Sequence, residues 1–208
     1  MDLFEAIRTR RSHRTFERRE VEPEKIGAIL DAAHWAPSPA NSQPWEFILV
    51  TGEKSRRRLY ELSEQAKKTG RVEVRGFSYV RPLPQGVAEE SGEDVALRQY
   101  SLAFLKNVPV IIGVVGLPVS PTQQRGQETY DSYKYSCGAV IENILLAATA
   151  LGLGSLWFTL FNQQLLRQFL GVDPSKHLVA LVCIGYPAIS APDPGRLPLE
   201  TKVRRLEI

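Results

Sequence analysis

The sequence predicts a single α+β domain in which helices flank a central sheet. Four short apolar runs have the length of buried strands, and the longer segments between them repeat their apolar residues at helical spacing. With 208 residues, 43% of them hydrophobic, the chain can bury one substantial core. No linker rich in serine, glycine or proline divides it into halves. We therefore expect one domain over residues 1–208.

The first third of the chain alternates between helix and strand. Asp2 is placed to cap a short helix that ends at a cluster of arginines. Pro23 opens a second helix, and Pro37 stops it. Residues 45–50 form an apolar run suited to a buried strand, and residues 54–68 form a polar helix.

The second half supplies the remaining strands. Residues 108–116 are almost wholly apolar and β-branched, which is typical of a central strand covered on both faces. Residues 135–151 form a strongly apolar helix that ends at Gly152, in the position of a left-handed C-cap. Residues 155–160 and 177–186 are two further strands with a helix between them.

Two segments have no regular pattern. Residues 70–99 contain several prolines and glycines and an acidic pair, and we expect a mobile lid there. The tail, residues 187–208, is proline-rich and then basic, too extended to pack on itself, and we expect it to cross onto another subunit.

Charge and hydropathy exclude several classes of protein. The formal net charge of +3 is too small to favour a nucleic-acid partner. The first residues contain no cationic stretch leading into an apolar one, and no run of about eighteen apolar residues occurs. We expect a cytoplasmic protein with no membrane and no nucleic-acid partner.

The cysteines and histidines do not indicate a metal site. Cys137 and Cys183 lie far apart, outside any CxxC pair, and are expected to be inert core thiols. The three histidines, His13, His34 and His177, are scattered along the chain rather than grouped at metal-ligand spacing.

The arginine cluster offers the first candidate binding residues. Arg10, Ser12 and Arg14 alternate, so in an extended segment their side chains would share one face. Two guanidiniums and a hydroxyl on one face suit a phosphate or a carbonyl group. An exposed basic helix end, whose charges complement the helix dipole, explains this segment equally well. A nucleic-acid patch is less favoured because only Phe16 offers a nearby ring for base stacking.

The familiar nucleotide and hydrolase motifs are absent. Gly152 and Gly154 follow a helix instead of opening one, and Trp157 stands where a dinucleotide fingerprint needs its third glycine. The chain contains no GxxxxGK[ST] phosphate loop, no HExxH pair and no GxSxG elbow.

Three segments together resemble the nitroreductase family of flavoproteins, almost from end to end. They are the arginine cluster with the string Ala36-Pro37-Ser38-Pro39-Ala40-Asn41-Ser42-Gln43-Pro44-Trp45, the segment Gly152-Leu153-Gly154-Ser155-Leu156-Trp157-Phe158-Thr159, and the tail Arg196-Leu197-Pro198-Leu199-Glu200. The resemblance implies a mixed central sheet flanked by helices. It also implies an interlocked homodimer that holds two FMN molecules at its interface.

The resemblance also implies which residues bind FMN. The N-terminal group would meet the phosphate, ribityl chain and pyrimidine edge, and the loop after residue 36 would reach the ring from the partner subunit. The end of the strand at residues 155–160 would pass the reactive N5 edge, and the tail would add a phosphate contact. The implied residues are Arg10, Arg11, Ser12, Arg14, Pro37, Ser38, Asn41, Gln43, Trp157, Phe158, Thr159 and Arg196. Thr159 is the candidate for hydrogen bonding to N5, although a strand threonine without a role explains it more simply on its own.

The implied reaction is the transfer of electrons from NAD(P)H to a nitroaromatic, a quinone or a similar electron-poor acceptor by a ping-pong mechanism. One departure opens an alternative, because Thr159-Leu160-Phe161-Asn162 stands where many members have glycines or a Pro-x-Glu-Gly segment. That stretch is similar to flavin-fragmenting enzymes of cobalamin lower-ligand synthesis and to iodotyrosine dehalogenases.

Neither specialised branch fits fully. The fragmenting branch tends to have an acidic residue where Ser12 stands, and residues 70–99 give no convincing match to the dehalogenase lid. A non-catalytic flavin-binding protein is the second alternative.

Overall fold

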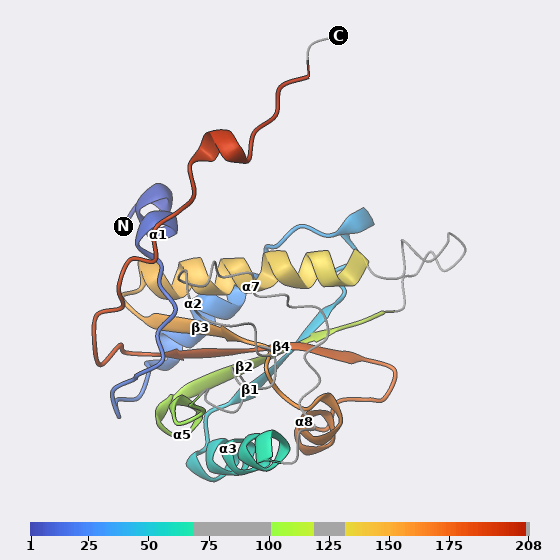
Figure 1. Cartoon of the computed structure of the whole chain (residues 1–208). Coiled ribbons are helices and arrows are strands. Elements are labelled where there is room, and N and C mark those ends of the chain that lie inside the picture. The colour runs from blue at the N-terminus through green and yellow to red at the C-terminus, as the bar shows by residue number, and fades with distance from the viewer. Residues whose placement is uncertain (69–100, 119–131, 207–208) are drawn as a thin grey trace, which may run out of the picture.

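The computed structural model describes residues 1–68, 101–118 and 132–206. Its centre is a four-stranded sheet with the spatial order β1-β2-β4-β3 (Figure 1). The strands are β1 (Trp45–Val50), β2 (Val110–Gly116), β3 (Gly154–Phe158) and β4 (His177–Gly185). The lid expected at residues 70–99 lies outside the described residues.

The expected α+β fold is confirmed, and the strands of the sheet pair antiparallel throughout. The resemblance implied a mixed sheet, whereas parallel pairing among the described residues is limited to one bridge between Ser12 and Ser155. The N-terminal segment runs along the outer edge of β3 in the same direction but pairs with it at this bridge alone among the described residues, so it adds no parallel strand to the sheet.

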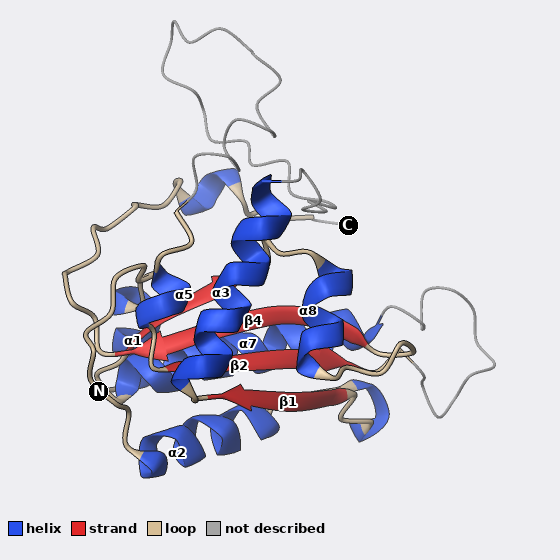
Figure 2. Cartoon of the chain, turned by 90° about the horizontal axis from the view of Figure 1, so that it is seen from below, coloured by secondary structure: helices blue, strands red, loops and turns tan. Residues whose placement is uncertain are grey.

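Helices cover both faces of the sheet, as Figures 1 and 2 show from two directions. On one face lie α2 (Pro23–His34) and α7 (Ser132–Ala150), which pack on each other and on the sheet. On the other face lie α3 (Glu53–Lys68), α5 (Phe104–Asn107) and α8 (Gln163–Leu170). The two faces therefore bury two separate apolar clusters.

Strand β2 joins the two clusters because every one of its residues is buried. Ile112 and Val114 pack in the cluster of α2 and α7, whereas Ile111 and Val115 pack in the cluster of α3, α5 and α8. Side chains alternate across a strand, so an apolar side chain is needed at every position. The expectation that residues 108–116 contain a central strand is confirmed.

The helix ends follow local capping rules. Asp2 caps α1 (Leu3–Thr9) by accepting a hydrogen bond from the backbone N–H of Glu5 at 2.9 Å. After α7, Gly152 has a φ of +75°, the left-handed conformation expected there. Asn162 caps α8 through the N–H of Leu165 at 2.9 Å.

Tyr186, just after β4, anchors the segment that leads into α2. Its hydroxyl donates to Glu22 Oε2 at 2.7 Å and accepts from Lys25 Nζ at 2.7 Å. The guanidinium of Arg19 stacks on the ring at 3.7 Å from the centroid. The hydrogen bond from Tyr186, aided by the nearby cations, lowers the pKa of Glu22 to about 2. This cluster holds the chain that follows the arginine segment against the end of β4.

Gly185 is required for close packing at the same place. A Cβ atom there would lie 2.6 Å from Cδ of Pro109 and 3.1 Å from Cδ1 of Phe16. We predict that Gly185→Ala lowers the free energy of unfolding by about 1–3 kcal/mol, because a rigid proline ring cannot move aside. Denaturant titration at one fixed protein concentration measures the effect.

Gly27 in α2 provides the matched control, because a Cβ there would meet nothing within 4 Å. Gly27→Ala is expected to raise the free energy of unfolding by about 0.5–1 kcal/mol, since alanine loses less backbone entropy in a helix. An unchanged stability for Gly185→Ala would contradict the close approach of Pro109 and Phe16.

Candidate functional site

The N-terminal arginine segment is held between β3 and the start of the C-terminal tail. Ser12 forms its bridge with Ser155, and the N–H of His13 donates to the carbonyl oxygen of Ser155 at 2.9 Å. On the other side, Phe16 forms an antiparallel bridge with Pro187. Backbone hydrogen bonds therefore set the position from which the arginine side chains extend.

Gly154 lets this segment approach the sheet. A Cβ at Gly154 would lie 2.8 Å from Cγ of His13, so the imidazole occupies the space that any other residue would fill. Burial lowers the pKa of His13, and a hydrogen bond with the backbone of Ile189 opposes the shift. His13 thus packs as a spacer between strand and tail.

The guanidiniums of this segment have different surroundings. Arg10 is half-buried and makes no side-chain hydrogen bond or ion pair with any residue that the structure describes. Arg14 is exposed, and its Nη1 donates to the carbonyl oxygen of Ser12 at 3.4 Å. The hydroxyl of Ser155 is buried without a hydrogen-bond partner among the described residues. A cation and a buried hydroxyl of this kind suit an anionic, oxygen-rich ligand.

Arg11 is the exception because its guanidinium is already bonded. Nη1 donates to the carbonyl oxygens of Arg8 at 2.6 Å and Arg10 at 2.9 Å. Nη2 forms an ion pair with Asp193 Oδ2 at 3.0 Å, and only 19% of the side chain is exposed. Arg11 therefore points toward the tail.

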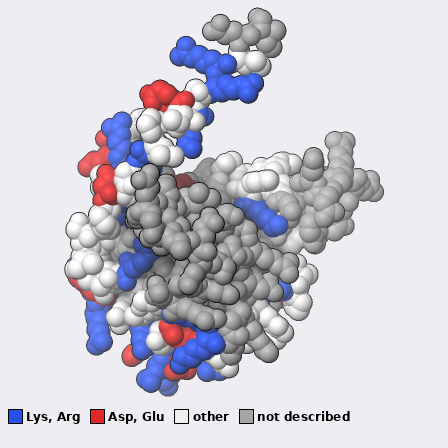
Figure 3. Space-filling view, viewed as in Figure 1, with Lys and Arg blue, Asp and Glu red and all other residues white. Residues whose placement is uncertain are grey.

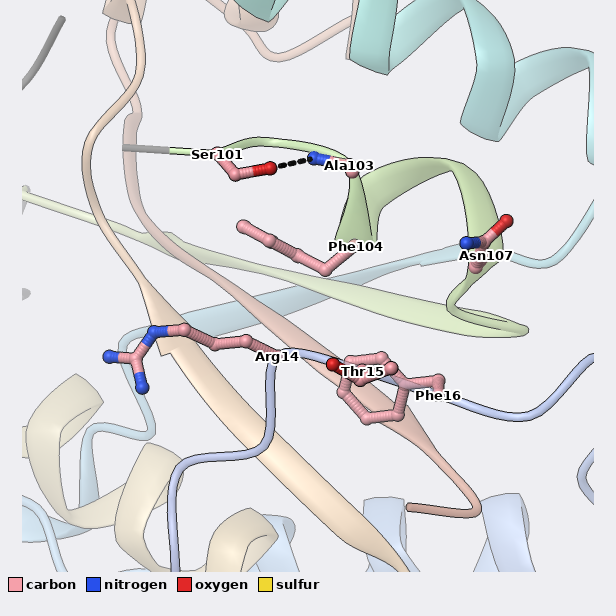
Figure 4. A pocket seen from close by; sticks show the side chains of 7 residues that line it. All are labelled: Arg14, Thr15, Phe16, Ser101, Ala103, Phe104 and Asn107. Carbon is pink, nitrogen blue, oxygen red and sulfur yellow. Dashed lines mark hydrogen bonds between the residues drawn. The ribbon is translucent and has the colours of Figure 1, made fainter. Parts of the chain in front are cut away.

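A cavity of about 470 Å³ adjoins Arg14 (Figure 4). The N-terminal segment lines one side and the residues around α5 line the other, with Phe104 between them. The lining residues are Arg14, Thr15, Phe16, Ser101, Ala103, Phe104 and Asn107. Of these residues only Arg14 was predictable from sequence as a ligand-binding residue, because a four-residue helix such as α5 has too few residues for a detectable apolar period.

The end of β3 presents three neighbouring residues in three different ways. The side chain of Trp157 is 41% exposed, that of Phe158 is buried, and Thr159 is half-buried just beyond the strand. Phe158 packs edge-on against Phe104 with ring centroids 5.2 Å apart, so its side chain is not available to a ligand. The carbonyl oxygen of Ser155 points outward, to the N–H of His13. Backbone groups alternate between the two sides of a strand, so those of Trp157, two residues later, point to the same outer edge of β3.

The loop that precedes β1 has an unusual backbone. Ala40, Asn41 and Gln43 have φ values of +50°, +53° and +46°, which non-glycine residues rarely adopt. Ser38 stabilises the loop, since its Oγ accepts a hydrogen bond from the N–H of Gln43 at 2.9 Å. Such strain collects at binding and catalytic sites because the surrounding structure must hold it in place. The neighbouring Pro37 is exposed.

The structure does not bring this loop to the arginine segment of the same chain. The loop joins β1, at one edge of the sheet, whereas Ser12 contacts β3 at the opposite edge. Trp45, at the start of β1, pairs with Gly116, and Gly116 pairs with His177 at the start of β4. The loop therefore also lies at the end of the sheet where β3 ends. One chain therefore presents the two groups at separate places.

Arg196 lies in the extended tail. Its Nη1 donates to the carbonyl oxygen of Gly195 at 2.8 Å, and its positive charge helps to lower the pKa of Asp193. The tail passes beside α1 (Figure 1), and the ion pair between Arg11 and Asp193 joins the stretch just before Arg196 to the arginine segment.

A second and larger groove, of about 920 Å³, lies at another part of the surface, where α2 and α3 begin. Figure 3 shows basic side chains both near the tail and at the lower end of the molecule, over α3. Most arginines of this groove have partners: Arg57 pairs with Glu61, Arg19 with Glu22, and Arg56 donates to the carbonyl oxygen of Pro109 at 2.9 Å. Most of these guanidiniums therefore already interact with other residues of the chain.

The two cysteines are poor nucleophiles in this fold. Both thiols are buried and free, and burial raises the pKa of Cys137 to about 12 and raises the pKa of Cys183 as well. The described residues contain no group of three side chains arranged to hold a metal ion. They also contain no helix with the length and apolarity needed to cross a bilayer.

Comparison with known proteins identifies a family and several relatives of this chain. The model of the nitroreductase family matches residues 7–186. A protein of Archaeoglobus fulgidus, provisionally named NADH dehydrogenase/NAD(P)H nitroreductase, is 30% identical over 190 residues, covering 89% of this chain and 86% of that protein. The 5,6-dimethylbenzimidazole synthase of Rhodospirillum rubrum is 28% identical over 198 residues, covering 94% of this chain and 87% of the synthase.

A solved structure shows the same fold. The iodotyrosine deiodinase crystallised with FMN and 3-iodo-L-tyrosine superposes with a TM-score of 0.76 at 22% identity, and the alignment covers all of both chains. The family match spans both the arginine segment and β3, the two elements that form the site described above. This chain is therefore a member of the nitroreductase family.

Proposed function

We propose that this protein is an FMN-dependent oxidoreductase that transfers electrons from NAD(P)H to nitroaromatics, quinones or similar electron-poor acceptors. The observation that carries the proposal is the backbone contact between Ser12 and Ser155 in a chain of this family. That contact aligns the arginine segment with the edge of β3, so cationic side chains and the end of the strand lie along the same edge of the sheet.

The residues present suit the phosphate of FMN. Arg10 carries a guanidinium without a partner among the described residues, and Arg14 extends from the same segment into solvent. Two guanidiniums on a segment that bridges Ser155, whose buried hydroxyl has no hydrogen-bond partner among the described residues, favour a dianionic group over a neutral one. In this proposal Arg10, Arg14 and Arg196 bind the phosphate, and Ser12 bonds to the polar chain or ring edge.

When bound, FMN supplies the redox chemistry, and the protein supplies binding, orientation and hydrogen bonds. The outward backbone groups of Trp157 and the hydroxyl of Thr159 are the protein groups proposed for the N5 side of the ring. The exposed face of Trp157 and the cavity beside Arg14 offer contact surface for the ring and the substrate. The chain needs no side-chain acid or base for a hydride transfer.

We further propose that two copies form the working enzyme. The apolar side chains Leu3 and Phe4 of α1 are 60% and 68% exposed, and several apolar residues of the tail are exposed as well. Large apolar side chains exposed together on one short helix favour a partner surface. The strained loop at residues 37–43 lies across the sheet from the arginine segment, so a second copy can supply it to the site.

A more specialised reaction is the alternative. Similarity to a 5,6-dimethylbenzimidazole synthase and to an iodotyrosine deiodinase, together with Thr159 at the end of β3, favours a flavin-fragmenting or dehalogenating enzyme. Loss of the reduced flavin in air with formation of 5,6-dimethylbenzimidazole, or release of iodide from iodotyrosine, would identify these reactions. Flavin binding without any reduction by NAD(P)H would identify a non-catalytic flavin-binding protein.

One experiment tests the main proposal. We expect the purified protein to show flavin absorption bands, to have the mass of a dimer in solution, and to be bleached anaerobically by NADH or NADPH. Adding a quinone or a nitroaromatic should restore the colour. A colourless monomer that does not bind added FMN would refute the proposal.

Arg10 is expected to contribute strongly to FMN affinity. We predict that Arg10→Ala raises the FMN dissociation constant by about 10- to 100-fold, the range for a lost hydrogen bond to a charged group. Fluorescence titration with FMN measures it. Arg18→Ala is the matched control, since Arg18 is an exposed arginine of the same segment that lines the second groove. Equal losses in the two variants would contradict a specific role for Arg10.

Thr159 is expected to act through its hydroxyl. Thr159→Val keeps the branched shape and removes one hydrogen-bonding group, so we predict that anaerobic reduction by NAD(P)H slows about two- to tenfold. Stopped-flow absorbance measures the rate, and the midpoint potential of the bound flavin should shift as well. If rate and potential both match the unmodified protein, the hydroxyl has no part at N5.

A further inference from the structure

The C-terminal tail runs antiparallel to the N-terminal arginine segment. Phe16 bridges Pro187, and one residue further the N–H of Ala188 donates to the carbonyl oxygen of Thr15 at 3.1 Å. Next along the tail, the backbone of Ile189 faces the side chain of His13 and raises its pKa, against the effect of burial. The two segments therefore stay side by side beyond the end of the sheet.

The ion pair between Arg11 and Asp193 is a further contact between these two segments, beyond the end of the sheet. The guanidinium of Arg11 is held on its own segment by the carbonyl oxygens of Arg8 and Arg10, at 2.6 and 2.9 Å. Nη2 is thereby directed at Oδ2 of Asp193, 3.0 Å away. An arginine with two fixed bonds loses less side-chain entropy on forming a third.

Asp193 also shapes the turn that leads to Arg196. Its Oδ1 accepts a hydrogen bond from the N–H of Gly195 at 2.9 Å, and Gly195 has a φ of +69°. An aspartate that bonds to the backbone two residues ahead, followed by proline and a left-handed glycine, makes a defined turn. The hydrogen bond from Gly195, with the charges of Arg11 and Arg196, lowers the pKa of Asp193. Arg196 comes directly after the glycine of this turn.

We propose that the ion pair of Arg11 and Asp193 positions Arg196 beside the phosphate site of the bound flavin. Arg11 then acts through Asp193, as a positioning residue, and does not itself contact the phosphate. This inference rests on the proposed function, because it specifies how the tail takes part in FMN binding.

The bonding of the carboxylate favours positioning over competition. A carboxylate that occupied the phosphate site would have to leave when FMN binds, and it would break both the turn and the contact with Arg11. Here one oxygen is used by the turn and the other by Arg11, whereas Arg10 has no acidic partner among the described residues. Arg10 and Arg196 therefore retain positive charge for the phosphate while Asp193 stays in place.

A comparison of FMN with riboflavin isolates the phosphate. Riboflavin has the same ring and ribityl chain but no phosphate, so only FMN should detect a displaced Arg196. We expect Asp193→Asn to weaken FMN binding by roughly two- to fivefold, the range an exposed ion pair supports, and to leave riboflavin binding unchanged. Dissociation constants of the full chain are measured by fluorescence titration. Asp31→Asn, at an exposed aspartate of α2, is the control and should alter neither constant.

Exchanging the two charges completes the test. Arg11→Asp and Asp193→Arg should each weaken FMN binding, and the double variant should recover part of the affinity for FMN. Equal weakening of FMN and riboflavin by Asp193→Asn would show a merely structural role, and tighter FMN binding would show competition. Either result overturns the inference while the proposed function stands. If the unmodified protein binds neither flavin, the proposed function itself fails.

Discussion

The arrangement of this protein depends on one backbone contact, in which the N-terminal segment lies between the outer edge of β3 and the beginning of the tail. The contact pairs Ser12 with Ser155 and Phe16 with Pro187, residues far apart in sequence. It works because Gly154 and Gly185 have no side chains and allow close approach by His13 and by Phe16. Without it the arginines would belong to a solvated helix end.

Because of this contact, the arginines of the segment have different surroundings. Arg10 and Arg14 extend from the docked segment, and in the proposed function their charges serve an anionic ligand. Arg11 turns the other way and holds the tail through Asp193. Neighbouring residues of one type thus take different roles, because the backbone directs successive side chains in different directions. For this reason the alternation of Arg10, Ser12 and Arg14 in the sequence predicted side chains on a shared face.

The candidate site was only partly predictable from sequence. The arginine segment and the Pro37–Gln43 loop were recognisable because local strings of residue types carry their chemistry. The cavity beside Arg14 was not, since Phe104 comes from a short helix without periodicity and Ser101 from the irregular segment before it. Asp193 was not singled out either, although the Asp-Pro-Gly string marks a turn. Its partner Arg11 is at the other end of the chain.

The sequence by itself determined the α+β class, the strand at the centre of the sheet, the caps of α1 and α8 and the family resemblance. These features depend on spacing and chemistry within short windows, where apolar period and capping are local properties. Only the tertiary structure decided that the strands pair antiparallel, that the tail follows the arginine segment, and that the strained loop lies across the sheet from it. Those arrangements arise from contacts between residues far apart in the chain, which no local pattern encodes.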